Sequence, residues 1–248
     1  MVYEKLIKIK EKYGTGYMVL VDPDKISTTN LEKKAELIQE NGADVILLGG
    51  STLITSEFED YVRRIKAAVD LPVILFPGDY RQIAKGADAI LFLSLISGRN
   101  ANYLIEEQVR GAYIIRSYGI EPIGTGYMLI ESGKVSTVEY VSRTRPVPRD
   151  KINLACVHAL AAQYLGMKMV YLEAGSGAPQ SVPDEMTTAV SGFVEIPVIV
   201  GGGIKNPKEA EKKAKSGASF VVTGNALEGS DFAVRIKEFA HAIHGAKA

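Results

Sequence analysis

The chain has 248 residues, of which 29 are basic and 29 acidic, so we expect no global attraction to nucleic acid or to an anionic membrane. Its single cysteine, Cys156, excludes an internal disulfide and fits a reducing, cytoplasmic location; we expect it to be buried on a helix. The longest strongly apolar run, residues 89–96, falls far short of the ~20 residues of a membrane span, and no signal peptide is expected.

Helices and strands alternate along the chain. Helices are predicted near residues 2–13, 30–41, 56–69, 102–118, 150–165, 183–192, 206–216 and 229–244. Strands are predicted near residues 17–22, 45–49, 73–76, 89–93, 123–130, 168–173, 197–201 and 219–223. No linker or change in composition divides the chain, so we expect one domain over residues 1–248.

A short phrase recurs where a charged helix passes into a strand. It occurs as Asn41-Gly-Ala-Asp-Val-Ile-Leu-Leu48, Lys85-Gly-Ala-Asp-Ala-Ile-Leu-Phe92 and Ser216-Gly-Ala-Ser-Phe-Val-Val222. The glycine suits a left-handed helix end, and the following residues suit a strand buried on both faces. Eight such strands predict a single (β/α)8 TIM barrel with an extra amino-terminal helix, rather than an open doubly wound sheet.

Two segments depart from this regular alternation. Residues 77–85 leave room for at most a turn or two between the third and fourth strands, so the third helix is predicted to be vestigial. After the fifth strand, residues 131–134 suggest a hairpin turn, with residues 135–140 returning as an extra strand.

Two glycine-rich turns follow the last two predicted strands. The first contains Gly201, Gly202 and Gly203, and the second contains Gly224 and Asn225. A turn without side chains lets backbone N–H groups approach an anion, and such turns after strands seven and eight form the usual phosphate site of this barrel. The sequence therefore predicts a phosphorylated small molecule as ligand, although each turn alone could be an ordinary tight connection.

A carboxylate stands at the end of the sixth predicted strand. Side chains alternate along a strand, so Tyr171 and Glu173 share one face, which we expect to be the barrel mouth. There Glu173 could act as a general base toward a hydroxyl; the alternative is a structural salt bridge. The backbone amides of Gly175, Ser176 and Gly177 could meet the same ligand.

Asp22, at the end of the first strand, is the strongest candidate metal ligand. Mg²⁺ typically takes one or two carboxylates and fills its other positions with water and phosphate oxygens. The hydroxyl of Ser51 on the neighbouring strand could be a weak or water-mediated ligand, whereas Asp22 could instead cap the turn before Pro23. Basic residues on mouth-side loops could receive a second anion or be solvated charges: Arg99, Lys134, Arg143, Arg145 and Arg149.

Five segments together resemble a known family. They are Val21-Asp22-Pro23-Asp24-Lys25, Leu48-Gly-Gly-Ser51, Tyr171-Leu-Glu-Ala-Gly-Ser-Gly177, Val200-Gly-Gly-Gly-Ile204 and Thr223-Gly-Asn225. The chain resembles the longer group of the geranylgeranylglyceryl phosphate synthase family, which includes the bacterial heptaprenylglyceryl phosphate synthases. The resemblance implies a Mg²⁺-assisted transferase that joins the C3 hydroxyl of sn-glycerol 1-phosphate to a prenyl diphosphate, with geranylgeranyl diphosphate expected. This reaction forms the first ether bond of archaeal-type membrane lipids.

The resemblance also implies roles for individual residues. Asp22 and Ser51 would bind the metal, and Glu173 would take the hydroxyl proton. Glycerol phosphate would be held by Tyr171, Leu172, Glu173, Ala174, Gly175, Ser176, Gly177, Gly202, Gly203, Gly224 and Asn225. The family further implies a homo-oligomer, a dimer or a hexamer, and we expect transient contact with a membrane surface during product release.

One position departs from the family pattern. Some members carry a lysine two residues before the strand-one aspartate, where this chain has Leu20, so any phosphate contact of that lysine is either absent here or supplied from elsewhere, such as by Lys25. Tyr127 and a cleft beside the short third helix would take the prenyl tail. Residues 91–96 and Tyr103 could line that cleft, although core packing explains most of this run equally well. Two other readings remain open: a phosphosugar isomerase or aldolase, and a non-catalytic phosphate-binding barrel.

Overall fold

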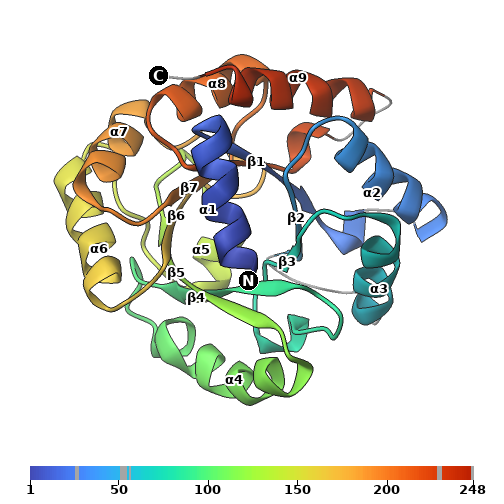
Figure 1. Cartoon of the computed structure of the whole chain (residues 1–248). Helices are drawn as coiled ribbons and strands as arrows, with labels where there is room; N and C mark the ends of the chain where they lie inside the picture. Colours follow the sequence, from blue (N-terminus) through green and yellow to red (C-terminus); the bar gives the residue numbers. More distant parts are fainter. Residues whose placement is uncertain (26–27, 51–54, 56, 228–230, 247–248) are drawn as a thin grey trace.

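The computed structural model describes residues 1–25, 28–50, 55, 57–227 and 231–246. Within this part of the chain, eight parallel strands close into a barrel in sequence order, β1 pairing with β8. The predicted TIM barrel is confirmed (Figure 1). The strands are β1 (Gly16–Val21), β2 (Val45–Leu48), β3 (Val73–Leu75), β4 (Ala89–Leu95), β5 (Glu121–Leu129), β6 (Met169–Glu173), β7 (Val198–Gly201) and β8 (Phe220–Thr223).

Helices surround the barrel as the alternation predicts. They are α1 (Val2–Tyr13), α2 (Leu31–Glu40), α3 (Phe58–Ala68), α4 (Glu107–Tyr118), α5 (Thr137–Ser142), α6 (Ile152–Tyr164), α7 (Asp184–Phe193), α8 (Pro207–Lys215) and α9 (Phe232–His244). Cys156 is buried on α6, as expected. Within the described ranges, no helix combines the length and the apolar character needed to cross a bilayer.

Alternating side chains divide the core into two layers. Inside the barrel, residues such as Met18, Leu91 and Tyr171 form one buried cluster. Between the strands and the outer helices, residues such as Leu172 and Val200 form the other. The predicted alternation at β6 is therefore confirmed, because Tyr171 points into the barrel while Leu172 packs against the helices.

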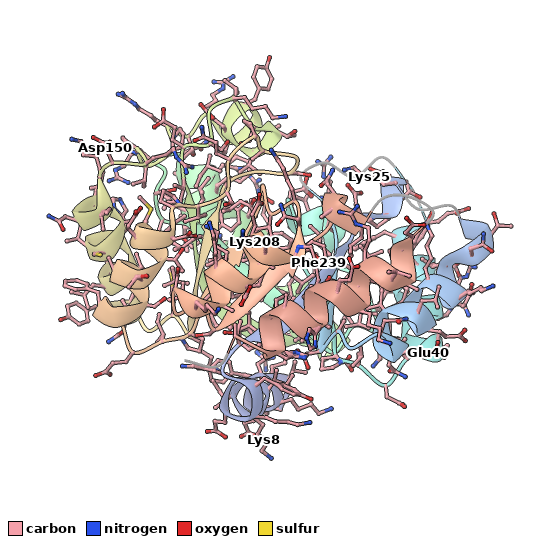
Figure 2. The ribbon with its side chains drawn as sticks, turned by 90° about the horizontal axis from the view of Figure 1, so that it is seen from above. Lys8, Lys25, Glu40, Asp150, Lys208 and Phe239 are labelled. Atoms are coloured by element: carbon pink, nitrogen blue, oxygen red, sulfur yellow. The ribbon has the colours of Figure 1, made fainter. Side chains whose placement is uncertain are left out.

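Helix α1 covers the amino end of the barrel. Its first backbone N–H groups, those of Val2 and Tyr3, donate to the carboxylate of Glu121 at the start of β5. Leu6 of α1 is completely buried in the cluster inside the barrel. Figure 2 shows α1, marked by Lys8, at the end of the molecule opposite Lys25, so the carboxyl ends of the strands form the open end.

The barrel helix expected between β3 and β4 is vestigial, as predicted; helix α3, which precedes β3, is a full helix. Between β3 and β4 the chain forms only the single-turn 3-10 helix η3 (Tyr80–Gln82), capped by the carboxylate of Asp79, which accepts the N–H of Arg81 at 2.8 Å. A π-helical turn, η4 (Asn102–Glu106), leads into α4 on the other side of this gap.

The hairpin and extra strand predicted after β5 are wrong. Residues 137–142 form helix α5, whose amino end is capped by Ser136: its Oγ accepts the N–H of Glu139 at 3.1 Å. The spacing of Ser136 and Glu139 is that of a helix-capping sequence, and this local signal outweighs the β-branched residues that suggested a strand. Only one isolated bridge, between Ile130 and Val147, extends the pairing beyond β5 in the described part of the chain.

Candidate functional site

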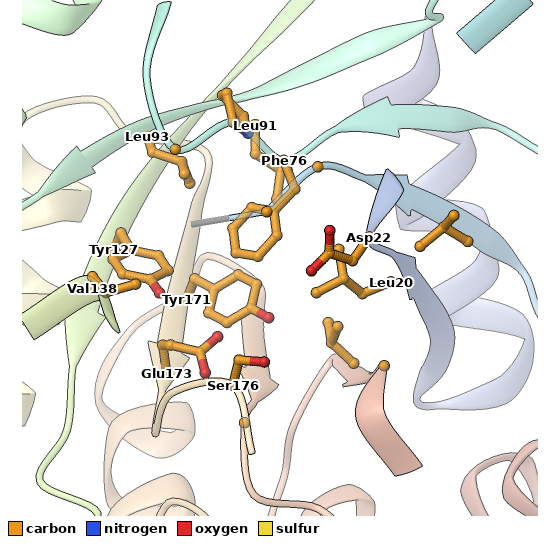
Figure 3. Close-up of a pocket in the computed structure, with 18 of the residues that line it drawn as sticks. Leu20, Asp22, Phe76, Leu91, Leu93, Tyr127, Val138, Tyr171, Glu173 and Ser176 are labelled. Atoms are coloured by element: carbon orange, nitrogen blue, oxygen red, sulfur yellow. The ribbon is translucent and has the colours of Figure 1, made fainter. Parts of the chain in front are cut away.

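A cavity of about 390 Å³ opens at the carboxyl ends of the strands (Figure 3). Its polar arm is lined by Asp22, Glu173 and the glycine turns after β6, β7 and β8. Its apolar arm passes η3 and continues between β4 and α4. The cavity therefore joins a polar, carboxylate-bearing region to an apolar groove within one site.

Glu173 lies at the centre of the polar arm. Its side chain is 5% exposed, and its Oε1 accepts the backbone N–H of Gly175 at 2.6 Å. A second hydrogen bond comes from the Tyr171 hydroxyl. Among the described residues, no Lys, Arg or His forms an ion pair with this carboxylate. Burial raises the pKa of Glu173 from 4.5 to about 7, against the lowering effect of its two hydrogen bonds.

The raised pKa of Glu173 predicts that stability depends on pH. Because the folded-state pKa of about 7 lies above the ordinary 4.5, the folded protein prefers Glu173 in its protonated form. The stability that this provides is complete below about pH 4.5 and is lost as the pH rises to about 7. At about 1.4 kcal/mol per pKa unit, the loss is ~3 kcal/mol. Glu173→Gln has no such loss. Urea unfolding should therefore show the variant's free energy of unfolding rising relative to the wild type by ~3 kcal/mol between about pH 4 and about pH 8. If the difference in free energy of unfolding between Glu173→Gln and the wild type did not change with pH, the pKa of Glu173 would not be raised by folding.

The glycine turn after β7 packs directly against Glu173. Gly202 has φ +80°, and a Cβ at this position would lie 2.2 Å from Glu173 Oε1 and 2.6 Å from the backbone N of Gly175. Gly203 has φ +68°, and its Cβ would lie 2.8 Å from the carbonyl oxygen of Gln180. Only glycine fits both positions without displacing its neighbours, so the bare turn and the carboxylate form one rigid unit.

The turn after β8 joins the same unit. The Ser176 hydroxyl donates to Oδ1 of Asn225 at 2.7 Å, linking the turn after β6 to the turn after β8. Gly224 lies against Leu20 of β1, with a built Cβ 3.4 Å from the Leu20 Cβ. The structure thus brings together the predicted residues of the phosphate cradle. All of them line the cavity except Leu172, Ala174 and Gly175. Leu172 and Ala174 belong instead to the buried cluster between the strands and the outer helices.

Asp22 lies at the edge of the same cavity, and Tyr171 lies between it and Glu173 in the view of Figure 3. Its Oδ1 accepts the backbone N–H of Asp24 at 3.1 Å. Gly50 stands beside the carboxylate: a Cβ there would lie 3.2 Å from Oδ1 and 3.5 Å from Oδ2. Ser51, the other predicted metal ligand, lies outside the described residues.

This corner has the chemistry that Mg²⁺ requires. The described residues hold no cluster of three or more His, Cys, Asp or Glu side chains. Magnesium does not need one, because it binds through one or two carboxylates plus water and phosphate oxygens. The Asp22 carboxylate, with no side chain on Gly50 beside it, fits an ion whose remaining ligands come from a bound phosphate.

Three aromatic rings, those of Phe76, Tyr127 and Tyr171, line the cavity side by side. Phe76 and Tyr171 stack with centroids 5.1 Å apart and an interplanar angle of 11°. The Tyr127 ring lies 5.4 Å from that of Tyr171 and 6.1 Å from that of Phe76. Sequence reasoning expected Tyr127 here but missed Phe76; its position directly after β3, at a strand end, was the available signal.

Of the basic residues considered from the sequence, only Lys25 lines the cavity. None of the five mouth-side basic residues lines this cavity; the Arg149 guanidinium, for example, donates to the carbonyl oxygens of Glu131 and Ser181. Lys25, Lys34 and Lys205 line it instead. The Lys205 ammonium donates to the carbonyl oxygen of Pro179 at 2.7 Å. Lys205 lies two residues after Gly203 of the first glycine turn, and that closeness was the missed signal.

The apolar arm follows the gap left by the third helix. Residues of β4 and of the π-helical turn line it: Leu91, Phe92, Leu93, Leu95 and Tyr103. Tyr80 of η3, Ile83 directly after it and Ile115 of α4 extend the apolar lining. A groove at this position is what the short third helix predicted.

Comparison with known proteins places the chain among close relatives. The sequence model described as the PcrB family matches residues 6–243. A curated protein of Pyrococcus horikoshii, named geranylgeranylglyceryl phosphate synthase, is 47% identical over 226 residues, which cover 91% of this chain and 88% of the relative. A protein of the same name from Chitinophaga pinensis is 41% identical over 245 residues, or 99% of this chain and 96% of the relative.

A solved structure is similar over the whole chain. It is (S)-3-O-geranylgeranylglyceryl phosphate synthase of Thermoplasma acidophilum in complex with its substrate sn-glycerol-1-phosphate. It has a TM-score of 0.93 and 36% identity, and the match covers 99% of each chain. Thiamine phosphate pyrophosphorylase of Pyrococcus furiosus, with a TM-score of 0.56 and 12% identity, shares the fold alone.

Proposed function

The chain belongs to the PcrB family, and we propose that it joins the C3 hydroxyl of sn-glycerol 1-phosphate to C1 of geranylgeranyl diphosphate. The products are an ether and free diphosphate, the first ether-forming step of archaeal-type membrane lipid synthesis. The observation that carries this proposal is the position of Glu173, buried between a bare glycine cradle and an apolar groove. A simple phosphosugar enzyme has no use for such a groove.

The glycine turns would hold the phosphate of sn-glycerol 1-phosphate. Backbone amides of the turns containing Gly202, Gly203, Gly224 and Asn225 suit an anion because no side chains cover them. The adjoining segment 171–177 carries the carboxylate that would face the glycerol hydroxyls. Lys205 adds positive charge at the rim of this cradle.

Glu173 would take the proton of the C3 hydroxyl. As that O–H bond breaks, the oxygen forms a bond to C1 of the prenyl chain, and the C1–O bond to the diphosphate breaks with its electron pair on the leaving oxygen. A pKa of about 7 leaves the Glu173 carboxylate ionised in a useful fraction near neutral pH and still basic enough to accept a proton. Phe76 and Tyr171 present a stacked aromatic wall, which favours positive charge developing on the allylic carbon.

Asp22, with Ser51, would hold Mg²⁺ at the opposite corner of the cavity. When bound, the ion offsets the negative charge that builds up on the departing diphosphate. Lys25 and Lys34 line the same region and favour binding of a polyanion. The apolar side chains of β4 would receive the tail.

Asp22→Asn should reduce turnover by at least ~10²-fold, because the amide keeps the shape of the carboxylate but loses the charge that binds a divalent cation. Steady-state assays should also show that a higher Mg²⁺ concentration is needed for half-maximal activity. Asp24→Asn is the matched control, since Asp24 is exposed and does not line the cavity. Near-normal turnover in Asp22→Asn would remove the metal-binding role.

The reaction itself can be tested in one incubation. The purified chain, sn-glycerol 1-phosphate, Mg²⁺ and prenyl diphosphates of several lengths should yield an ether detectable by mass spectrometry, most rapidly with the geranylgeranyl substrate. The enantiomeric sn-glycerol 3-phosphate is the matched control. Absence of ether with every chain length, together with turnover of a phosphosugar, would favour an isomerase or aldolase instead.

We also propose that the chain acts in the cytoplasm as a homo-oligomer, a dimer or a hexamer, with transient contact to a membrane surface as the product leaves. Large apolar side chains remain exposed on the outer helices, among them Val109 and Tyr113 of α4 and Tyr164 of α6. Such side chains are suited to burial between copies. Sedimentation velocity that shows only monomer would contradict the oligomer.

A further inference from the structure

The single-turn helix η3, which follows β3, makes a specific contact with the turn after the neighbouring strand β2. Gln82, the last residue of η3, is 1% exposed and does not line the cavity. Its Nε2 donates to the carbonyl oxygen of Gly50 at 3.0 Å, and its Oε1 accepts the backbone N–H of Gly50 at 3.4 Å. The buried side-chain amide of Gln82 thus donates one hydrogen bond to the backbone of Gly50 and accepts another from it.

That glycine is held on its other side by Asp22. The Cβ missing from Gly50 would lie 3.2 Å from the Asp22 Oδ1, so the carboxylate rests against its bare Cα. The preceding Gly49 has φ +150°, and its Cβ would lie 2.1 Å from the carbonyl oxygen of Phe76. The N–H of Gly49 donates to the Val21 carbonyl oxygen at 3.1 Å. Gly50 is therefore clamped between the Gln82 amide and the Asp22 carboxylate.

We propose that Gln82 is a positioning residue for the diphosphate end of the site. It holds Gly50 in place and thereby fixes the corner at which Asp22 meets the prenyl diphosphate and its Mg²⁺. This inference rests on the proposed function. Two consecutive glycines have wide conformational freedom, so the turn needs an outside partner to keep one geometry. The side-chain amide of Gln82 supplies that partner from the segment where other barrels have a full helix.

Replacing Gln82 should weaken binding of the prenyl diphosphate and leave binding of sn-glycerol 1-phosphate unchanged. In Gln82→Leu, the N–H and C=O of Gly50 lose their partner and the Gly49–Gly50 turn is free to shift away from Asp22. Binding of the diphosphate should weaken by ~10-fold, about the effect of one or two lost hydrogen bonds in a pre-organised site. Binding of sn-glycerol 1-phosphate should stay within about twofold, because Gly202, Gly203 and the segment 171–177 touch neither residue.

The measurement is isothermal calorimetry on wild type and Gln82→Leu with two separate ligands. One is geranylgeranyl thiolodiphosphate with Mg²⁺, in which a C–S bond replaces the reactive C–O bond; the other is sn-glycerol 1-phosphate. Steady-state assays should agree, with a higher KM for the prenyl diphosphate and an unchanged KM for glycerol phosphate. The matched control is Gln39→Leu. The Gln39 Oε1 accepts two backbone N–H groups, of Asp70 at 2.7 Å and Leu71 at 3.2 Å, at the amino end of β3, far from the mouth.

Gly50→Ala tests the same contact from the other side and covers the case in which Gln82→Leu fails to fold. Its new Cβ would press on Asp22 while Gln82 stays intact, so it should show the same selective loss of diphosphate binding. The inference alone is overturned in two cases, in both of which the wild type binds the thiolodiphosphate. In the first, both variants bind it as well as the wild type does; in the second, both variants lose binding of both ligands together. Wild type that neither binds the thiolodiphosphate nor forms ether overturns the proposed function, and the inference with it.

Discussion

Glu173→Gln should lower kcat by at least ~10²-fold while the protein stays folded and still binds sn-glycerol 1-phosphate. The amide oxygen of Gln can still accept the Gly175 N–H that now reaches Glu173 Oε1 at 2.6 Å, so the shape of the site is kept. What is lost is the ability to take a proton from the C3 hydroxyl. Rapid-quench measurement of ether formation, with calorimetry for glycerol phosphate, separates the chemical step from binding.

A matched carboxylate is available for comparison. Glu121 also accepts backbone N–H groups, those of Val2 and Tyr3, but it lies under α1 at the closed end of the barrel. Glu121→Gln should leave kcat near the wild-type value. If Glu173→Gln turned over nearly as fast as wild type, Glu173 would not be the base, and a non-catalytic role in ligand binding would be favoured.

Gly202→Ala should weaken sn-glycerol 1-phosphate binding by roughly 10²-fold or more. The added methyl group would lie 2.2 Å from Glu173 Oε1 and 2.6 Å from the Gly175 nitrogen, at a residue whose φ of +80° already disfavours a side chain. The cradle or the carboxylate must therefore move. Calorimetry with glycerol phosphate alone measures the loss without depending on turnover.

Gly192→Ala is the control for this substitution. Gly192 is an exposed residue of α7 with nothing within 4 Å of a built Cβ. Alanine is favoured over glycine in a helix by ~1 kcal/mol, so this variant should bind the ligand normally and be at least as stable as wild type. Wild-type affinity in Gly202→Ala would mean that the turn after β7 does not hold the phosphate.

The features set by local sequence patterns could be predicted. The repeated passage from helix to strand, such as residues 85–92, fixed the places of the strands because a glycine helix end and a doubly buried strand each leave a local mark. The missing third helix followed from counting residues between β3 and β4. Glu173 could be placed at the mouth because alternation at β6 leaves only two faces.

The features set by spatial neighbours could not. Residues 135–140 carry both a β-branched pattern and a helix-capping sequence, and the cap of Ser136 on Glu139 decided between them. The strand-end position of Phe76 and the closeness of Lys205 to the first glycine turn were signals in the sequence that went unused. Gln82 left no such signal, because it matters only through its contact with Gly50, 32 residues away in the sequence.

Helix α1 closes one end of the barrel. Leu6 and the two hydrogen bonds to Glu121 hold α1 over the amino end, while the cavity opens at the carboxyl ends of the strands. Under the proposed function, the tail of the ether product and the tail of a new prenyl diphosphate would occupy the same groove, so the product would have to leave before the next prenyl chain could bind. The face covered by α1, from which Lys8 points outward, is therefore the side by which the enzyme can be attached to a bead without blocking access to the cavity.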